Sequence, residues 1–255
     1  MEKIRFILLV LVVYLFSQSF VFAKEQVIIY GDDNYPPYSF EKNREPKGIY
    51  VKVLKSAFSD MPDYNVTIKM VPWKRGLAYI KRGQGLALFP PYYSEKRKQW
   101  MLFSEPILKE QVIVFGTKEK LNGKAIWPED FYGYKIGLNR GFGLYAVGGD
   151  KFGDACKAGK IKIQEANNND QNLKKIKYGR IDFYINDRLI DISQYPSIKR
   201  GVVANINYGY LGFTKKNEIF SFKSDFIEKF NRSIKKMKES GEIKKIIETY
   251  LNRKN

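Results

Sequence analysis

The segment Ser94-Glu-Lys-Arg97-Lys-Gln-Trp-Met-Leu-Phe103-Ser104-Glu-Pro106 is the most informative stretch of this 255-residue chain. Its arginine follows a hydroxyl residue by three positions and precedes Phe103 by six. A guanidinium group is always charged, and its planar fork of donors can meet a carboxylate through two hydrogen bonds. An isolated arginine in a basic loop is usually a solvated surface residue. The spacing around Arg97 is what makes it a candidate carboxylate-binding residue.

Two further segments support this interpretation. An aromatic–proline turn, Tyr35-Pro-Pro-Tyr-Ser-Phe40, lies near the start of the chain, and Gly179-Arg-Ile-Asp182-Phe-Tyr-Ile-Asn-Asp187 lies downstream. Together with the Arg97 segment, they resemble the extracellular solute-binding proteins of family 3, the polar amino-acid-binding group of ABC importers. The similarity covers nearly the whole mature chain. It implies an α/β fold of two doubly wound α/β lobes joined by a two-strand hinge, the type II periplasmic binding protein fold.

The hydrophobic pattern points to the same architecture. Short apolar strands alternate with amphipathic helices in both halves of the chain, which is typical of doubly wound α/β lobes. We expect strands at residues 25–30, 66–70, 86–89, 110–117, 134–138, 160–164, 181–185 and 209–214. We expect helices at residues 48–58, 73–82 and 169–178, terminal helices within 222–251, and a short helix after the glycine turn at 141–143.

Two connections are expected to form the hinge, one outgoing near residues 111–118 and one returning near 209–216. The predicted first lobe comprises residues 24–114 and 212–255, and the second comprises 115–211. Ligands of open α/β sheets bind beyond the carboxyl ends of the strands. With two such lobes facing each other, the binding site is expected in the cleft between them.

Residues 1–23 have the features of a secretory signal peptide. Lys3 and Arg5 precede an uncharged apolar run at residues 6–16, and Val21-Phe-Ala23 places small residues before the expected cleavage point. This run is shorter than the about 20 apolar residues that a membrane-spanning helix needs. No cysteine stands near the cleavage point to carry a lipid anchor. We therefore expect a soluble protein that is free in the periplasm.

Composition narrows the function classes. The net charge of +18 raises the possibility of nucleic-acid binding. However, the lysines are dispersed and form no arginine-rich recognition motif, so we expect a solvated basic surface and no nucleic-acid partner. A bias toward anionic ligands or the anionic cell envelope is the alternative. The chain has no histidine, the commonest metal ligand and general base, and we expect no metal and no cofactor. Cys156 is the only cysteine, which excludes an intramolecular disulfide.

The resemblance assigns the two ends of a zwitterionic ligand to two residues. Arg97 matches the arginine that grips the ligand carboxylate, and Asp187 matches the aspartate that binds the α-amino group. The alternative for Asp187 is a capping role at a following helix. Tyr35 and Trp73 match two rings that sandwich the ligand side chain, with packing inside the lobe as the alternative.

The remaining candidates carry less specific signals. Asp32 is either a contact for a polar side chain or the start of an Asx turn, and Ser94 keeps the family's hydroxyl near the arginine. Gly143 belongs to a Gly-x-Gly segment that is either an anion site at a helix N-terminus or a simple tight turn. Two departures stand out: Tyr92 and Phe142 occupy positions where the family usually has threonine or serine. These bulky rings predict a smaller or reshaped pocket.

The leading functional hypothesis is a periplasmic solute-binding protein without catalytic activity. It would capture a small amino acid or related carboxylate and deliver it, as a monomer, to an ABC permease in the inner membrane. One alternative is a lyase of cyclohexadienyl-dehydratase type on the same fold, which needs a general acid or base in the cleft. Another is a ligand-sensing module without transport.

Overall fold

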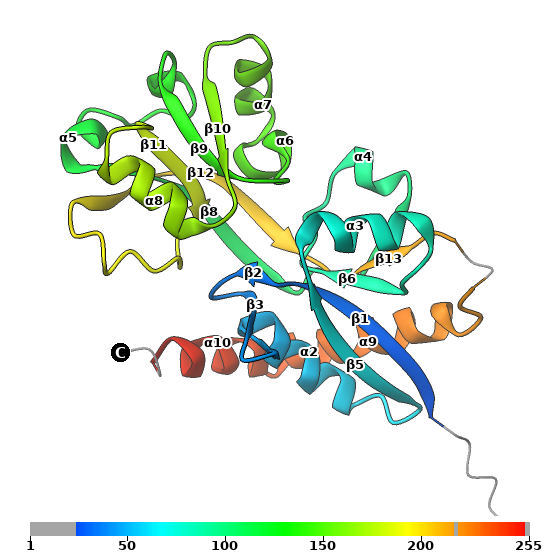
Figure 1. The fold of residues 1–255 in the computed structure, drawn as a ribbon. Helices are drawn as coiled ribbons and strands as arrows, with labels where there is room; N and C mark the ends of the chain where they lie inside the picture. The colour runs from blue at the N-terminus through cyan, green and yellow to red at the C-terminus, as the bar shows by residue number, and fades with distance from the viewer. Residues whose placement is uncertain (1–23, 217–218, 253–255) are drawn as a thin grey trace, which may run out of the picture.

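The computed structural model describes residues 24–216 and 219–252. The predicted signal peptide lies outside this range. Two five-stranded sheets, each flanked by helices, form two units that we call lobe 1 and lobe 2 (Figure 1). The predicted residue boundaries of the lobes stay a prediction. Within the described residues, no helix is both long and apolar enough to cross a bilayer.

Lobe 1 contains a mixed sheet of strand order β5-β1-β6-β13-β7. Strand β1 (Glu25–Asp32) runs parallel to β5 (Tyr64–Val71) and to β6 (Ala87–Phe89). Strand β13 (Gly212–Thr214) pairs antiparallel with both β6 and β7 (Met101–Phe103). Asp32 is the last residue of β1, and the carboxyl end of β6 leads into the segment that carries Tyr92.

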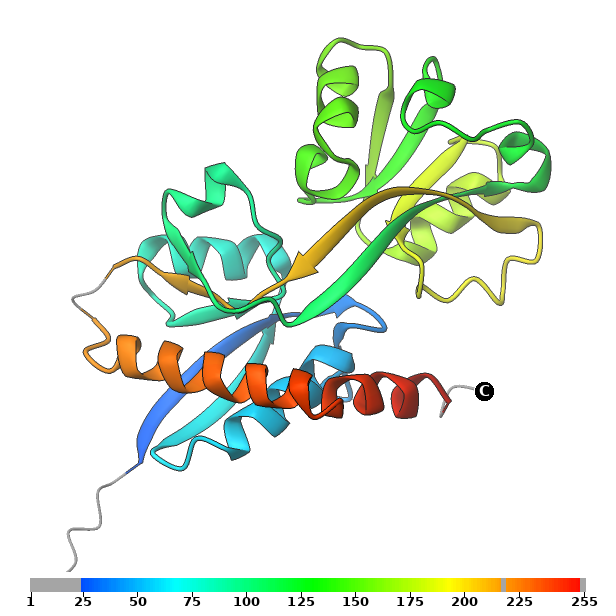
Figure 2. The same ribbon diagram turned by 180° about the vertical axis from the view of Figure 1, so that it is seen from behind.

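Helices cover both faces of the lobe 1 sheet (Figures 1 and 2). On one face lie α2 (Ile49–Ser59), α9 (Lys223–Glu239) and α10 (Glu242–Asn252), and their buried residues join the largest hydrophobic core. On the other face lies α3 (Trp73–Arg82), where Ile80 packs on Leu88 and Met101. The smaller elements of this lobe are β2 (Asn34–Tyr35), β3 (Ser39–Lys42), β4 (Glu45–Lys47) and α4 (Glu95–Lys98).

Lobe 2 contains a sheet of strand order β10-β9-β11-β8-β12. Strand β9 (Lys135–Asn139) runs parallel to β10 (Lys162–Ala166) and β11 (Phe183–Asp187). Its helices are α5 (Lys118–Leu121), η1 (Glu129–Phe131), α6 (Leu144–Gly148), α7 (Asp150–Lys157) and α8 (Asn169–Lys177). Two hydrophobic clusters, one on each side of the sheet, make its core.

Two long antiparallel strands connect the lobes. Strand β8 (Leu108–Thr117) and strand β12 (Ile198–Gly209) pair from Leu108 opposite Gly209 to Thr117 opposite Ile198. Both views show them side by side as they pass from lobe 1 into the lobe 2 sheet (Figures 1 and 2). Such a two-strand connection allows the lobes to move apart and together about a hinge.

The predicted fold class is confirmed, and most expected elements are present. Helix α3 has the predicted bounds, and β1, β5, β8, β9, β10, β11, α2 and α8 differ from the prediction only near their ends. The strand expected at 209–214 is wrong in its first half, because Gly209 ends β12 and β13 begins at Gly212. Strand β12 itself was not predicted.

Candidate ligand-binding site

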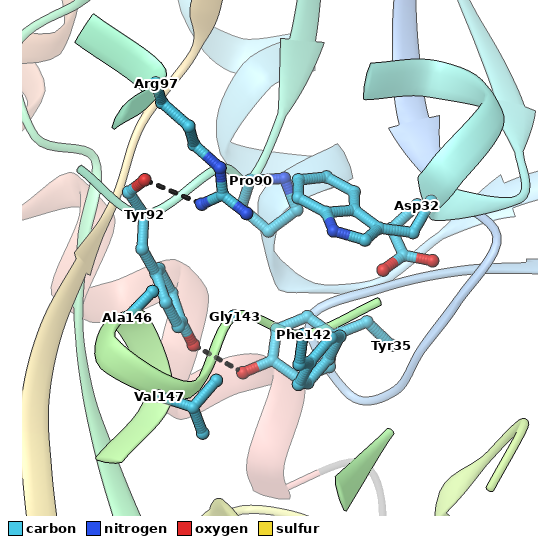
Figure 3. A pocket seen from close by; sticks show the side chains of 10 residues that line it. Asp32, Tyr35, Pro90, Tyr92, Arg97, Phe142, Gly143, Ala146 and Val147 are labelled. Carbon is cyan, nitrogen blue, oxygen red and sulfur yellow. Dashed lines mark hydrogen bonds between the residues drawn. The ribbon is translucent and has the colours of Figure 1, made fainter. Parts of the chain in front are cut away.

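A cavity of about 30 Å³ lies between the lobes (Figure 3). Lobe 1 contributes Asp32, Tyr35, Trp73, Pro90, Tyr92 and Arg97 to its wall. Lobe 2 contributes Phe142, Gly143, Ala146 and Val147. Seven of the nine candidate residues from the sequence therefore line one cavity. Ser94 and Asp187 are the two that do not.

Arg97 is held by the first turn of a short helix. The Ser94 side chain is the N-cap of α4 and accepts a hydrogen bond from the Arg97 backbone N–H at 3.3 Å. The Arg97 guanidinium donates to the Tyr92 carbonyl oxygen at 2.8 Å and lies 5.6 Å from the centre of the Trp73 ring. Ser94 thus positions Arg97 from behind and is not part of the cavity wall.

The charge of Arg97 has no acidic partner. In the described part of the chain, no carboxylate oxygen lies within 4.0 Å of its guanidinium. Burial lowers the pKa of Arg97 to about 10, although the nearby Tyr92 opposes that shift. A half-buried, unpaired cation that faces a cavity is a site for an anionic group.

Aromatic rings close the cavity from both lobes. Tyr35 of lobe 1 meets Phe142 of lobe 2 edge to face, with ring centres 5.8 Å apart. Tyr35 also stacks on Tyr38, with ring centres 5.3 Å apart. Trp73, the first residue of α3, lines the same cavity. The rings of Tyr35 and Trp73 therefore combine lobe packing with exposure to the cavity, so the two interpretations of these residues are compatible.

Asp32 also combines two roles. One of its oxygens accepts the Asn34 backbone N–H at 3.0 Å, which confirms the Asx turn, and the residue lines the cavity. Burial raises the pKa of Asp32 to about 7; the Asn34 hydrogen bond opposes this shift and the charge of Asp33 adds to it.

The glycine segment of lobe 2 forms a tight turn. Gly141 has a φ of 89°, in the region that favours glycine, and Phe142 N–H donates to the Asn139 carbonyl at 3.0 Å. Gly143 follows as the residue before α6, a helix of only five residues. The tight turn is confirmed, and an anion site at Gly143 stays a prediction.

Asp187 lies away from the cavity wall. It is fully buried at the end of β11, where one carboxylate oxygen accepts the Tyr38 hydroxyl at 2.9 Å and the Leu189 backbone N–H at 2.7 Å. The capping alternative is wrong, because residues 188–197 contain turns and no helix. The other carboxylate oxygen is buried and has no hydrogen-bond partner among the described residues. Asp187 therefore joins the lobes through Tyr38, and its contact with a ligand stays a prediction.

A buried glutamate behind the cavity was missed by the sequence reasoning. Glu110 is fully buried near the start of β8, and three tyrosine hydroxyls donate to its carboxylate. The Tyr35 and Tyr92 hydroxyls both donate to Oε2 of Glu110 at 2.6 Å, and the Tyr50 hydroxyl donates to Oε1. Burial, followed by the charge of Asp187, raises the pKa of Glu110 to about 7, while the three hydrogen bonds oppose the shift. The available sequence signal was an acidic residue just before the apolar run Val112–Phe115 of the strand.

A larger space adjoins this cavity. It has a volume of about 340 Å³ and shares Asp32, Trp73 and Phe142 with the inner cavity. Its outer wall includes Lys74 of lobe 1 and Arg140 of lobe 2. Asn34 and Asn167 also line it, and the Asn34 side chain donates to the Asn167 carbonyl across the lobes at 3.2 Å. The interlobe space thus includes a small inner cavity with an unpaired cation and a wider part that adjoins it.

The chain is similar to a known protein family and to several known proteins. Residues 27–253 match the bacterial extracellular solute-binding proteins, family 3. The probable amino-acid-binding protein YxeM of Bacillus subtilis (strain 168) is 21% identical over 226 residues, which cover 85% of this chain and 80% of that protein. A histidine kinase sensor domain with similarity to periplasmic binding proteins superposes with a TM-score of 0.74 at 17% identity, covering 89% of this chain and 96% of that one.

An ancestral arginine-binding protein bound to arginine superposes with a TM-score of 0.71 at 20% identity, covering 89% of this chain and 98% of that one. At these identities the solved structures establish a common fold. The family match is of a different kind, because it spans both lobes and both hinge strands. The chain therefore belongs to the bacterial extracellular solute-binding proteins, family 3.

Proposed function

We propose that this protein binds a small amino acid or related carboxylate between its lobes, in the periplasm, and delivers it to an ABC permease. The observation that carries the proposal is the unpaired guanidinium of Arg97 in the wall of an interlobe cavity. A ligand carboxylate would supply the missing negative charge and accept the donors that Arg97 leaves unused. The similarity to YxeM, a probable amino-acid-binding protein, and to an arginine-binding protein bound to arginine favours an amino acid as the ligand.

The size of the cavity implies that binding requires movement. A volume of about 30 Å³ holds about two water molecules, which is less than any amino acid needs. The lobes must therefore separate about β8 and β12 to admit a ligand and then close around it. Tyr92 and Phe142 both line this space, in keeping with a pocket reduced by bulky rings. The wider outer part offers room for a ligand side chain.

A thermal-shift screen tests this function. The mature protein is heated with each of the common amino acids and with a set of small organic acids at millimolar concentration. A ligand present at 100 times its dissociation constant stabilises the folded state by about 2.7 kcal/mol. We expect at least one amino acid or carboxylate to raise the unfolding temperature. If no compound of either class does so, the proposal is wrong.

Delivery to a permease needs a separate test. Uptake of the labelled ligand is measured in cells with and without the gene for this protein, at equal permease expression. We expect uptake to depend on the protein. Ligand binding without any effect on uptake would instead favour the sensing alternative. The similarity to the histidine kinase sensor domain is the reason for considering that alternative.

One observation favours the lyase alternative. Asp32 is a buried carboxyl group in the cavity wall with a pKa raised to about 7, near the value that suits a general acid or base at neutral pH. Incubation of the protein with prephenate or arogenate, followed by detection of the aromatic product, decides this case. Product formation that is lost in Asp32→Asn would establish the lyase.

A further inference from the structure

One edge of the lobe 2 sheet is strongly basic. Strands β9, β10 and β11 are parallel, so all three begin at this edge, and the pairing register places the end of β8 and the start of β12 beside them. Figure 1 shows α5 and the beginnings of β9 and β10 at the end of lobe 2 that points away from lobe 1. We call this surface the basic edge, and it comprises residues 117–124, 132–135, 158–162, 177–182 and 197–199.

The basic edge gathers charges that are far apart in the sequence. It contains nine lysine or arginine residues but only two acidic residues, Glu119 and Asp182. Eight of the nine basic residues are exposed, and Lys124 is half-buried. In the part of the chain that the structure describes, Lys120 is the one of the nine that forms an ion pair, with Asp182 at 2.9 Å. The other eight positive charges have no ion-pair partner among those residues.

The terminal helices of lobe 1 are also rich in lysine, but their charges are balanced. Helices α9 and α10 contain eight basic and five acidic residues, and four of the basic residues form ion pairs. Balanced charge of this kind is typical of a solvated surface. On the basic edge the like charges repel one another, and an anionic partner would relieve that repulsion.

Two exposed tyrosines lie among the charges of the basic edge. Tyr132 is 36% exposed and Tyr178 is 64% exposed. The Lys160 Nζ lies 5.1 Å from the centre of the Tyr132 ring, and the Lys177 Nζ lies 5.8 Å from the centre of the Tyr178 ring. Tyrosine is enriched where a bilayer meets water, and lysine is attracted to anionic lipid headgroups. Exposed tyrosines beside lysines therefore suit the surface of an anionic membrane.

Nucleic acid fits the composition of the basic edge less well. Eight of its nine basic residues are lysines, and Arg180 is the single arginine. Nucleic-acid recognition favours arginine, because its planar fork matches phosphates and bases through paired hydrogen bonds. A lysine ammonium is a compact point charge, which is sufficient for attraction to a charged surface without a fixed geometry.

We propose that the basic edge docks this protein on a bilayer that contains anionic phospholipid. The inference goes beyond the proposed function and does not depend on it, because the interlobe spaces are lined by other residues. The opposite ends of the same strands face lobe 1: β9 ends at Asn139, which lines the wider interlobe space, and β11 ends at Asp187, which binds Tyr38. Attachment through the basic edge thus keeps the cleft on the side away from the bilayer.

Vesicle cosedimentation tests this docking. The mature protein is mixed with vesicles of phosphatidylcholine alone, or of phosphatidylcholine with about 30% phosphatidylglycerol, in about 0.1 M salt. We expect the protein to sediment with the anionic vesicles and to stay in solution with the neutral ones. Binding should weaken severalfold in about 0.5 M salt, because the charges are then screened over a shorter distance.

Two variants with equal loss of charge show whether the basic edge is responsible. The test variant combines four substitutions at strand ends of the basic edge: Lys118→Gln, Lys135→Gln, Lys162→Gln and Lys199→Gln. The control combines four substitutions on lobe 1: Lys42→Gln, Lys55→Gln, Lys69→Gln and Lys81→Gln. All eight lysines are exposed and have no ion pair among the described residues.

The two variants should differ clearly in vesicle binding. Each lysine near an anionic membrane contributes about fivefold to binding, so the loss of even two simultaneous contacts lowers the partition coefficient about 25-fold. We expect a decrease of at least this size in the test variant and of less than about threefold in the control. If circular dichroism shows that the test variant does not fold, acetylation of the unmodified protein decides the question. Anionic vesicles should then protect Lys118, Lys135, Lys162 and Lys199 and leave the four control lysines reactive.

Several outcomes would overturn the inference. One is no binding to the anionic vesicles at about 0.1 M salt. Another is an equal decrease in both variants, or equal protection of both sets of lysines, which would show that net charge alone is responsible. A third is tighter binding to double-stranded DNA or to heparin than to the anionic vesicles at the same salt concentration, which would make a nucleic acid or an acidic polysaccharide the partner. None of these results changes the outcome of the thermal-shift screen.

Discussion

Replacement of Arg97 by alanine separates ligand binding from folding. Burial lowers the pKa of Arg97 to about 10. At about 1.4 kcal/mol per pH unit, keeping this guanidinium charged destabilises the ligand-free folded protein by roughly 3 kcal/mol. The substitution recovers that cost but removes a charged hydrogen bond to the Tyr92 carbonyl, worth about 1.5–3 kcal/mol, and the contact with the Trp73 ring, worth about 0.5–1 kcal/mol. These contributions nearly cancel, so the free energy of unfolding should change by no more than about 1 kcal/mol.

Ligand binding should respond very differently. A carboxylate enclosed without its charged partner costs about 2–5 kcal/mol, which raises the dissociation constant roughly 30- to 5,000-fold. Urea denaturation measures the first quantity and calorimetry with the best ligand of the thermal-shift screen measures the second. Arg75→Ala is the matched control, since Arg75 lies on the same lobe, is exposed and does not line the cavity. The reasoning is refuted if Arg97→Ala lowers the free energy of unfolding by more than about 2 kcal/mol and leaves the affinity unchanged.

Three further predictions concern the ligand-free protein. Burial raises the pKa of Asp32 and Glu110 to about 7 and of Asp187 to about 6. Between about pH 4.5 and about pH 7 the folded state therefore holds protons that the unfolded chain has released. The free energy of unfolding measured in urea should fall as the pH rises through this interval. A rise over the same interval would contradict the raised pKa of these carboxyl groups. Tyr38→Phe removes the hydroxyl that joins lobe 1 to Asp187 and should lower the free energy of unfolding by about 1–3 kcal/mol, with a larger radius of gyration in solution scattering; no change in either quantity would exclude this bond as a lobe contact. Gly48→Ala should lower the free energy of unfolding by more than about 2 kcal/mol, because Gly48 has a φ of 117° and the new Cβ would collide with the Tyr38 carbonyl. Gly123→Ala is the control: Gly123 has a φ of 72° with open space around it, so the loss should be about 1 kcal/mol. Equal losses in the two variants would show that the collision at Gly48 is relieved.

Local patterns in the sequence were sufficient for much of the fold and for part of the site. Helix α3 was predicted with its observed bounds because Gly83, in the left-handed conformation, ends it. The link between Ser94 and Arg97 is equally local, since an N-cap hydroxyl three positions earlier fixes the helix turn that carries the arginine. Asp32 ends β1, Tyr35 ends β2 and Trp73 is the first residue of α3. The fold places these positions next to the cleft.

Features that depend on distant parts of the chain were not predictable in the same way. Strand β12 contains Gly201, Asn205 and Asn207, so its sequence resembles that of a loop. Its pairing with β8 includes two register shifts. Its strand state comes from the ladder that β8 offers. The surroundings of Glu110 are also non-local, because its tyrosine partners lie 75, 60 and 18 positions away in the sequence. Only the folded chain brings them around one carboxylate.

Under the proposed function, the charges around the inner cavity would make closure selective for a zwitterion. Among residues 24–216 and 219–252, Arg97 has no acidic partner, and Glu110 has hydroxyl donors but no basic partner. A simple carboxylate neutralises the first charge and leaves the second, and a simple amine does the reverse. A ligand that carries both groups offsets both charges at once and gains contacts that exist only when lobe 2 closes on lobe 1. Because a ligand shifts a conformational equilibrium only by its difference in affinity for the two states, this double compensation is the step by which the binding site can couple recognition to closure.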